Sequence, residues 1–469
     1  MLTPPGQVAD EPGHVFRVQA LLAGQLIGHR ESIIWIDGST RTTAGVRVDP
    51  VTLAAAFPQL GIPIRNISAE QLLSKRALAW THTRHFVEIA PLAVYAPVFY
   101  VPGAIGFGLA QWLGGSPFQA QIAGRLVNLL SYAAMGLLAL SIARRGQALI
   151  FCVLSVPMTV SLAGSLNQDG QIIAAAALGT ALLTVPAPWT TEQRHAWHDR
   201  SFWAGVALLA CIALVKIPYV GLAALALIPI SGPGSRPLVV RAAALAIIVA
   251  PALAWTLYAM VNVSAPTPMM PYSPGPLWPG DPSIVFRGPD ASAQLRVLLS
   301  EPARLITMPL QAIMADPWLF RQGIGVLGWL DLPLQAWLYT LWTWALVCAC
   351  LADFLARADD GRPALRIGPT EIVLLALSAA PMVIAIYQSQ YLLWTPVGGS
   401  SISGPAGRYW LPLVPLLAIA VPRCRPLPWA RAAAAMSVGS AALTIVPVAA
   451  AFASLVAVPA LVVMTYFVR

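Results

Sequence analysis

The chain has 469 residues, of which 58% are hydrophobic and only 10% are charged. Its mean hydropathy is +0.71, and a soluble protein of this length does not carry so many long apolar runs with so few charges. The formal net charge is +9, but the arginines gather in short loops between apolar runs, as the positive-inside rule expects, so a nucleic-acid partner is excluded. We therefore predict an all-α polytopic membrane protein, because only helices and closed barrels satisfy the backbone in lipid.

The first polar feature is VADEPGHVFR, in which the adjacent acids Asp10 and Glu11 are followed by His14 and Arg17. Proline is tolerated in the first turn of a helix, and residues three and four apart share a helix face. Glu11, His14 and Arg17 therefore form one predicted stripe. The local pattern leaves two interpretations open, a functional site or an N-cap at Asp10 followed by a solvated surface.

Changes in composition divide the chain into five predicted segments. They are a first external loop with an amphipathic helix (1–30), an external insertion (31–88), a first set of membrane helices (89–262), a Pro-rich external loop with a short amphipathic interfacial helix (263–332), and the C-terminal membrane helices (333–469).

The apolar runs predict about 11–12 transmembrane helices, each of about 20 residues. The candidate spans are 119–143, 147–165, 171–187, 202–231 (two helices), 238–261, 333–356, 370–388, 409–422, 430–448 and 450–468. The run 89–113 is interrupted by three prolines, so it is either a span or a bent interfacial helix.

The arginine-rich loops at 188–200, 232–241, 357–368 and 422–431 are assigned to the cytoplasm. The remaining connections then lie outside, and they hold the unusual polar residues Asn167, Asp169, Lys216, Tyr387, Gln388, Gln390, Arg408 and Tyr409. Ionisable groups near a membrane are costly and are usually functional or paired. Their collection on one face predicts a site at the outer membrane surface. Asp10 and Asp169 share that side only if 89–113 is not a full span, which places Arg144 and Arg145 inside.

Several familiar signatures do not occur. Four cysteines lie in apolar helices and Cys424 lies in a basic loop, with no CxxC or Cys/His spacing, so neither a disulfide framework nor a Cys/His metal site is predicted. We find no DxD, no GxGxxG and no P-loop for a nucleotide-linked substrate.

Seven motifs occur in the chain in this order: TPPGQVADEPGHVFR, EIAPLAVYAPVFYVP, RLVNLL, SLNQDG, LVKIPY, GVLGWLDLPL and ISGPAGRYWLPL. The ordered set resembles a bacterial polytopic membrane family, domain of unknown function twenty-one forty-two. The first three motifs resemble its opening motif, its Tyr/Pro-rich lead into the membrane and its Arg-Leu-x-Asn segment. The last four resemble its later Asp, Lys-x-x-Tyr, Trp-Leu-Asp and Gly-Arg-Tyr elements. The matches cover most of the chain.

That family is similar to the GT-C glycosyltransferases, which take a sugar from a polyprenyl-phosphate carrier on the outer side of the membrane. The resemblance implies a GT-C-like fold and an inverting glycosyltransferase in the bacterial cytoplasmic (inner) membrane, with a cell-envelope glycan or lipid as acceptor. Asp10 and Glu11 occupy the position of the superfamily's essential first-loop acid, and Asp169 resembles its second-loop acid. Superfamily members differ in their use of a divalent metal, so metal dependence stays open.

In one respect the chain departs from the family pattern. Family members have a transmembrane helix before the TPP segment, whereas this sequence begins at Met1-Leu2-Thr3. We expect the true start to lie upstream, the alternative being a truncated protein.

Transfer from a lipid phosphate needs a carboxylate for the acceptor hydroxyl, cations for the departing phosphate and an apolar groove for the lipid. Asp10 is the first choice for the base and Glu11 the second. Adjacent acids point in different directions, so we expect only one of them to face the acceptor.

Six further residues are predicted to bind substrate or phosphate: His14, Arg17, Asp169, Lys216, Arg408 and Tyr409. Each has a structural alternative. His14 either orients the acid or is a satisfied surface histidine, and Arg17 either pairs with the acids or holds phosphate. Lys216 suits a phosphate or snorkels to the interface. Asp169 either binds the donor or a metal, or caps a helix. Arg408 and Tyr409 follow a glycine-rich loop, which either presents the arginine to a phosphate or merely connects two helices. Trp329 could stack on a sugar and Asp331 could accept a hydrogen bond from it, although an interfacial aromatic belt is favoured for the tryptophan.

Two other functions remain open from the sequence. A transporter or flippase of lipid-linked sugars predicts ionisable residues at mid-depth in several helices, and few lie there. A non-enzymatic envelope-assembly protein predicts that Asp10 and Glu11 are replaceable.

Overall fold

The computed structural model describes residues 2–34, 40–57, 64–185, 197, 199–227, 237–265, 289–356, 368–404, 406–421 and 430–468, with side chains of the last segment described from Val438 on. Predictions for Cys424, for most of the arginine-rich loops and for most of the Pro-rich loop lie outside these residues.

Five helices in the described segments are long and apolar enough to cross a membrane. They are α6 (Pro117–Ile142), α12 (Leu238–Asn262), α16 (Ala336–Leu355), α17 (Pro369–Leu393) and α19 (Ala430–Tyr466), the last through Val438–Tyr466. About 20 helical residues rise about 30 Å, the thickness of the hydrocarbon core. The prediction of a mostly helical membrane protein is therefore confirmed, and the described residues contain fewer full-length spans than the sequence predicted.

The other predicted spans are divided into shorter helices. Pro157 begins a new helix, so 147–165 becomes α7 (Gln147–Ser155) and α8 (Pro157–Ala163). The remaining short elements are α9 (Asp169–Leu183), α10 (Arg200–Val215), η3 (Ile217–Ala223), α11 (Ala224–Leu227), η5 (Gly407–Leu413) and α18 (Val414–Ala420). The predicted spans 430–448 and 450–468 are one helix, α19, because prolines inside a transmembrane helix are tolerated.

The proline-interrupted run 89–113 is not a full span. It forms α4 (Ala90–Ala93), η1 (Val98–Tyr100) and α5 (Val101–Trp112). The 12 residues of α5 rise about 18 Å, well short of the hydrocarbon core. The backbone of α5 approaches α6 closely at Gly106, where a Cβ atom would lie 2.4 Å from the carbonyl oxygen of Ala123.

The insertion after the first helix contains a sheet, so the all-α prediction was wrong in this segment. Strands β1 (His29–Ile34), β2 (Thr40–Val48) and β3 (His85–Glu88) pair antiparallel in that order, with Gly45 opposite both His29 and Glu88. The threonines and valines of β2 favour a strand. Helices α2 (Val51–Ala54) and α3 (Ala69–Ala77) lie between β2 and β3 in the chain. The sheet packs on α1 (Glu11–Leu22) through apolar residues that include Val46 and Phe16.

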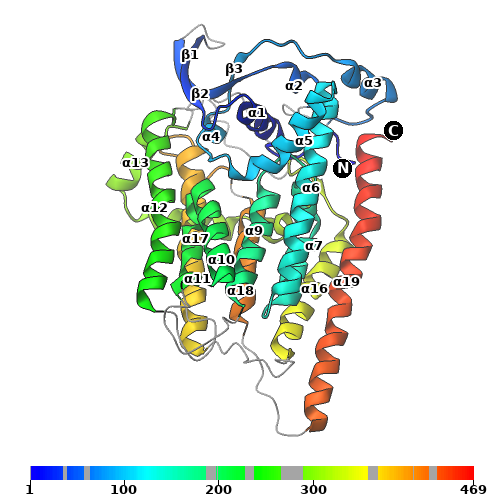
Figure 1. Ribbon diagram of the computed structural model, residues 1–469, viewed down its shortest axis with the longest axis vertical. Coiled ribbons are helices and arrows are strands. Elements are labelled where there is room, and N and C mark those ends of the chain that lie inside the picture. Colours follow the sequence, from blue (N-terminus) through cyan, green and yellow to red (C-terminus); the bar gives the residue numbers. More distant parts are fainter. Residues whose placement is uncertain are drawn as a thin grey trace.

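The sheet and α1 to α3 lie together at one end of the helical bundle, here called the sheet end (Figure 1). The C-terminal end of α12 is held there, because Arg30 in β1 donates hydrogen bonds to the carbonyl oxygens of Met260 and Ser264. Helices α12 and α19 begin at the opposite end, beside two of the arginine-rich segments (Figure 1). Arg145 donates to the carbonyl oxygen of Val421 at 2.6 Å, next to one of those segments.

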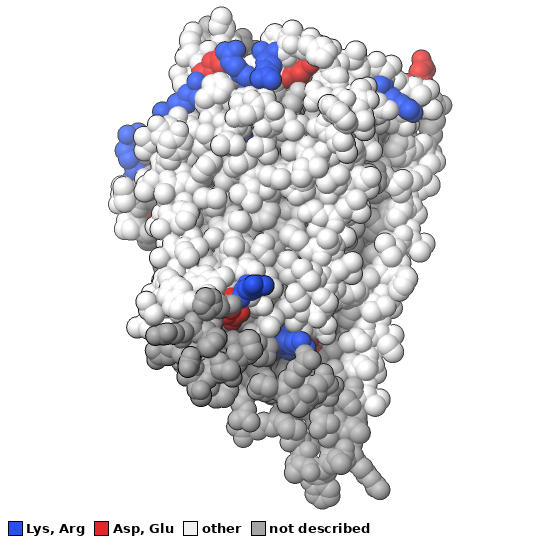
Figure 2. Space-filling view, viewed as in Figure 1, with Lys and Arg blue, Asp and Glu red and all other residues white. Residues whose placement is uncertain are grey.

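Charged residues are distributed as a bilayer requires. Figure 2 shows one face of the molecule, on which Lys, Arg, Asp and Glu gather toward the two ends and leave a broad uncharged band between them.

Between α12 and α16 the described chain forms mainly short elements. They are α13 (Ala291–Ser300), α14 (Arg304–Ala315), α15 (Leu319–Gly325) and the two-residue strands β4 (Val326–Leu327) and β5 (Leu332–Pro333). Helix α14 is the predicted interfacial helix, and its residues Ile306, Leu310 and Met314 are exposed.

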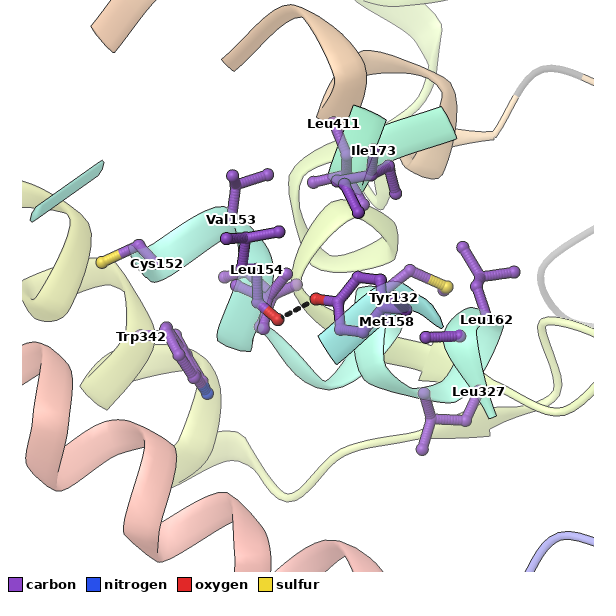
Figure 3. Close-up of a cluster of buried hydrophobic side chains, with 14 of the residues drawn as sticks. Tyr132, Cys152, Val153, Leu154, Met158, Leu162, Ile173, Leu327, Trp342 and Leu411 are labelled. Carbon is purple, nitrogen blue, oxygen red and sulfur yellow. Dashed lines mark hydrogen bonds between the residues drawn. The ribbon is translucent and has the colours of Figure 1, made fainter. Parts of the chain in front are cut away.

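A buried apolar cluster contains side chains from helices α6, α7, α8, α9 and α16 and from strand β4 (Figure 3). Within it the Tyr132 hydroxyl donates to the carbonyl oxygen of Leu154. Because α7 ends at Ser155, that carbonyl lies in the last turn, where helical partners are lacking.

Trp342 tests the packing of α16 on α19. It is fully buried, and its indole N–H donates to the Ser454 hydroxyl at 2.9 Å. We expect Trp342→Ala to cost about 3–5 kcal/mol of unfolding free energy. The matched variant Trp344→Ala removes a side chain that is 60% exposed on the same helix, and it should change little. The measurement is the thermal unfolding midpoint in lipid nanodiscs. Equal midpoints for the two variants would contradict this packing.

Candidate functional site

The adjacent acids Asp10 and Glu11 have different surroundings at the start of α1. Asp10 adopts a left-handed φ of 65° and makes no side-chain capping bond, so the capping alternative is not observed. Its carboxylate instead accepts a hydrogen bond from the Arg408 guanidinium in an ion pair. A left-handed backbone is uncommon outside glycine, although aspartate tolerates it better than most residues.

Glu11 is fully buried, and its carboxylate is held by hydrogen bonds within the fold. One carboxylate oxygen accepts from Arg125 Nε at 2.6 Å and from the Leu166 amide at 3.0 Å, and the other accepts from the Gly6 amide at 2.9 Å and from Arg125 Nη2. The same guanidinium donates to the carbonyl oxygens of Thr3 and Pro4. Glu11 and Arg125 therefore bind the N-terminal loop to α6 and to the turn between α8 and α9.

Asp10, Asp169, Lys216 and Arg408 form what we call the ion-pair cluster. Lys216 Nζ donates to one oxygen of Asp169, and Arg408 Nε lies 3.7 Å from the other. The side chains of Arg408, Asp169 and Lys216 are 5, 8 and 12% exposed, whereas that of Asp10 is 24% exposed. Four predicted site residues from distant parts of the chain thus meet, and Asp10 is the most accessible of them.

Tyrosine rings surround the cations of the cluster. Lys216 Nζ lies 5.0 Å from the Tyr409 ring centroid and 5.8 Å from that of Tyr95. Arg408 also donates to the Tyr409 hydroxyl at 3.1 Å, and the Tyr219 hydroxyl donates to the Tyr409 carbonyl oxygen. Cations over aromatic faces are stabilised electrostatically, so these rings hold both cations in place.

The turn before α9 places Asp169. The Asn167 side chain accepts from the Asp169 amide at 2.9 Å and donates to the carbonyl oxygen of Ala9 at 3.2 Å. Asn167 therefore links the two acidic loops directly. Lys216 has an extended backbone at the end of α10 and precedes the proline-containing η3, so the helix ends where the ammonium reaches the cluster.

Arg408 is positioned by close packing of η5 on α15. A Cβ atom on Gly407 would lie 2.1 Å from the carbonyl oxygen of Leu319, so only glycine fits. The Gly407 amide donates to Gln322 Oε1 at 2.9 Å, and Gln322 Nε2 donates to Asp316 at 3.2 Å.

His14 and Arg17 are buried, so the solvated-surface alternative for α1 is not observed. His14 Nδ1 and the Tyr100 hydroxyl are hydrogen-bonded at 2.7 Å. Burial lowers the pKa of His14 to about 4 and raises that of Tyr100, so both are neutral near pH 7. Arg17 does not pair with Asp10 or Glu11. One of its nitrogens donates to the carbonyl oxygens of Leu26 and Tyr95, while Nε and Nη1 have no hydrogen-bond partner among the described residues.

Several residues around the cluster have no role predicted from the sequence. Arg125, Tyr95 and Tyr100 lie in the family-like motifs, which is the only sequence signal for them. Gln168 likewise lies in the motif SLNQDG. It is fully buried beside Asp169, and neither polar atom of its side chain has a partner in the described structure.

Trp329 and Asp331 do not join the cluster. The Trp329 indole donates to the carbonyl oxygen of Gly6 at 3.0 Å, and the Trp329 amide donates to Asp331, so this pair supports the N-terminal loop. Among the described residues no three His, Cys, Asp or Glu side chains are placed to bind a metal ion. Asp10 and Asp169 each pair with a cation, an arrangement that does not suit a divalent metal.

Residues 1–417 match a family described as predicted membrane protein (DUF2142). The chain belongs to this family. The match contains every residue of the ion-pair cluster, and with the five candidate spans it makes the chain a multi-pass membrane protein. No curated protein and no solved structure matches the chain.

Charge-neutralising variants of the two adjacent acids should separate their roles. Glu11→Gln leaves the buried Arg125 without its counter-ion, and we expect a loss of about 3–5 kcal/mol of unfolding free energy. Asp10→Asn affects a partly exposed carboxylate and should cost much less. Unfolding midpoints measured side by side in nanodiscs test this. A larger loss for Asp10→Asn would reverse the assignment.

The buried, neutral His14 predicts a defined pH dependence of stability. Its pKa is about 4 in the fold against about 6.5 in an unfolded chain. The unfolded state therefore binds more protons between these values, and the free energy of unfolding falls by up to about 3 kcal/mol as the pH drops through this window. Above it the contribution of His14 is constant. We expect His14→Gln to lose distinctly less stability between pH 6.5 and 4, measured by unfolding midpoints. Parallel curves for variant and wild type would contradict this.

Proposed function

We propose that the chain is a GT-C-type membrane glycosyltransferase of the bacterial cytoplasmic membrane. It would transfer a sugar from a polyprenyl-phosphate donor to a cell-envelope glycan or lipid acceptor on the outer face. The observation that carries the proposal is the ion-pair cluster, in which the partly exposed carboxylate of Asp10 pairs with Arg408, and Arg408 and Lys216 meet at Asp169. The motif resemblance to a GT-C-like family supports the same class.

In the proposed reaction the acceptor hydroxyl oxygen attacks the anomeric carbon of the donor sugar. The bond from that carbon to the phosphate oxygen breaks, and its electron pair leaves with the polyprenyl phosphate. Asp10 accepts the hydroxyl proton as general base. Attack opposite the leaving group inverts the anomeric configuration.

Lys216 and Arg408 would stabilise the phosphate as it gains charge. An ammonium has three N–H donors, and Lys216 gives one to Asp169. Arg408 Nε makes no hydrogen bond to the described residues. Both cations can therefore take a phosphate oxygen while Asp169 still holds them, which makes Asp169 a positioning residue.

His14 and Arg17 would influence this cluster without contacting the substrate. Arg17 lies 5.8 Å from the Tyr100 ring centroid and carries two unpaired buried nitrogens, so it adds positive potential toward a phosphate. A neutral His14 bonded to Tyr100 is suited to orient groups near Asp10 and does not itself supply charge.

The sheet end would face outward. Helices α12 and α19 begin at the other end, beside arginine-rich segments, and such segments stay in the cytoplasm. Asp10 begins α1, which lies at the sheet end, so the proposed base is on the side where lipid-linked sugars would be used.

Loss of the Asp10 carboxylate should abolish transfer without loss of the protein. We expect Asp10→Asn to lower product formation by about 10²–10⁴-fold, the usual contribution of a general base. Glu70→Gln, which changes an exposed acid on α3 at the sheet end, is the matched control. The measurement is mass spectrometry of envelope glycans in a deletion strain complemented with each form at equal membrane levels.

Two outcomes would overturn the proposal. If deletion removes no sugar from the envelope, the chain is not this transferase. If Asp10→Asn restores the glycan as fully as Glu70→Gln, the carboxylate is structural, and a transporter or assembly protein becomes the better account.

A further inference from the structure

An open cavity of about 550 Å³ lies beside the start of α14. It is lined by the turn between α13 and α14, by the first two turns of α14 and by Ser400, in the loop that follows α17. Its charged side chains are Glu301 and Arg304, and its other polar side chains are Thr307, Gln311 and Ser400. The volume lies within the range of small-ligand sites. Its described lining contains no residue of the ion-pair cluster, so it is a separate feature of the surface.

The Arg304 guanidinium is fixed in place at this cavity. Its Nε donates to a Glu301 carboxylate oxygen at 2.6 Å, and its Nη1 donates to the Tyr391 hydroxyl at 3.0 Å and to the Gly399 carbonyl oxygen at 3.3 Å. Arg304 is thereby tied to the end of α17 and to the loop that holds Ser400. These bonds use Nε and Nη1, so the two N–H groups of Nη2 remain for an acceptor in the cavity.

The charges of the cavity balance, which restricts the ligands that it suits. Glu301 is exposed, and its pair with Arg304 uses one carboxylate oxygen, so the other oxygen can accept from a ligand. An anion alone would be repelled by Glu301, and a cation alone would be repelled by Arg304. A ligand that carries both charges can place its anion at Arg304 and its cation at Glu301, and this arrangement satisfies both side chains.

Helix α14 also presents an exposed apolar face beside the cavity. Ile306, Leu310 and Met314 are exposed and recur every four residues, so they share one face of the helix. Thr307 and Gln311 each follow one of these residues directly, which places them along the adjoining face. A helix with this division lies in the membrane interface, with its apolar face among acyl chains and its polar face at the headgroups.

The contacts of α14 with α17 place the cavity at the depth of lipid headgroups. Gln388, near the end of α17, donates through Nε2 to the carbonyl oxygens of Arg304 and Leu305. Helix α17 is one of the five candidate spans. Its 25 residues rise about 37 Å, slightly more than the thickness of the hydrocarbon core. The end of α17, and with it the start of α14, therefore reaches the headgroup region.

We propose that this cavity, here called the α14 headgroup site, binds a phospholipid whose headgroup carries a phosphate and a primary ammonium. The phosphate accepts hydrogen bonds from Arg304 Nη2, the ammonium donates to Glu301, and an acyl chain lies along Ile306 and Leu310. Both polar contacts are charge-assisted hydrogen bonds. A primary ammonium has three N–H donors and a quaternary ammonium has none, so the site selects ethanolamine over choline. The inference does not depend on the proposed transferase function.

Glu301→Gln tests the charge balance with little effect on the fold, because an exposed ion pair contributes little stability. The site then has one net positive charge and should favour an anionic headgroup. Arg304→Gln removes the group that holds the phosphate. The matched controls are Glu70→Gln and Arg296→Gln, which change an exposed acid on α3 and an exposed arginine on α13 that does not line the cavity.

The test uses the full chain in nanodiscs of phosphatidylethanolamine, phosphatidylcholine and phosphatidylglycerol in equal parts, with identical acyl chains. Native mass spectrometry identifies the lipid that the released protein retains, and the thermal unfolding midpoint reports folding. We expect the wild type to retain phosphatidylethanolamine several-fold over the other two lipids. Glu301→Gln should shift retention to phosphatidylglycerol at an unchanged midpoint, and Arg304→Gln should lose retention of both. Glu70→Gln and Arg296→Gln should keep the wild-type preference.

Three results would overturn the α14 headgroup site. They are equal retention of the three lipids by the wild type, a Glu301→Gln variant that keeps the wild-type preference, and a shift in Arg296→Gln as large as that in Arg304→Gln. The last result would mean that the lipids respond to the general surface charge. Glycerophosphoethanolamine, the same headgroup without acyl chains, should not displace the lipid at millimolar concentration. Displacement would identify a site for a soluble phosphate ester and would refute the lipid.

Discussion

The buried ion pair between Glu11 and Arg125 determines where the candidate site lies. Neither charge tolerates burial alone, so their shared hydrogen bonds hold the N-terminal loop, α6 and the turn before α9 together. Asp10 immediately precedes Glu11, and Asn167, which joins Ala9 to Asp169, immediately follows Leu166. The same contacts therefore place both acids of the ion-pair cluster. Glu11, which the sequence suggests as the second candidate for the base, is therefore the residue that positions Asp10, the first candidate.

Several buried polar groups without a hydrogen-bond partner in the described structure lie around the ion-pair cluster. Gln168 precedes Asp169, Arg17 donates to Tyr95, which lines the cluster, and Arg408 Nε faces Asp169 without a hydrogen bond. Each buried group without a partner destabilises the fold by about 1–3 kcal/mol. A ligand bound at the cluster would supply hydrogen bonds that these groups do not make within the protein.

Local pattern and motif order predicted part of this molecule. Apolar runs long enough to cross a bilayer identified α6, α12, α16 and α17. Prolines explain why other apolar runs form shorter helices. The sheet was missed because a short β-branched segment such as β2 gives a weak signal within a long insertion. The predicted membrane topology placed Asp10, Asp169, Lys216 and Arg408 on one side of the membrane. It could not predict which of them form ion pairs, because that depends on tertiary packing. Nothing local distinguishes Glu11, which faces Arg125, from Asp10, which faces Arg408.

The charge balance of the cluster suits the proposed reaction. Two carboxylates and two cations sum to zero, which limits the cost of burying them near a membrane. If Asp10 accepts the acceptor's proton as proposed, it would cease to be a counter-ion for Arg408. At the same step the departing phosphate would gain one negative charge, and Arg408 could turn to it. Proton transfer and release of the cation would therefore be coupled through one guanidinium, and stabilisation would be greatest where charge develops. Lysine at position 408 would keep the charge but lose the planar fork that lets one side chain face both acids.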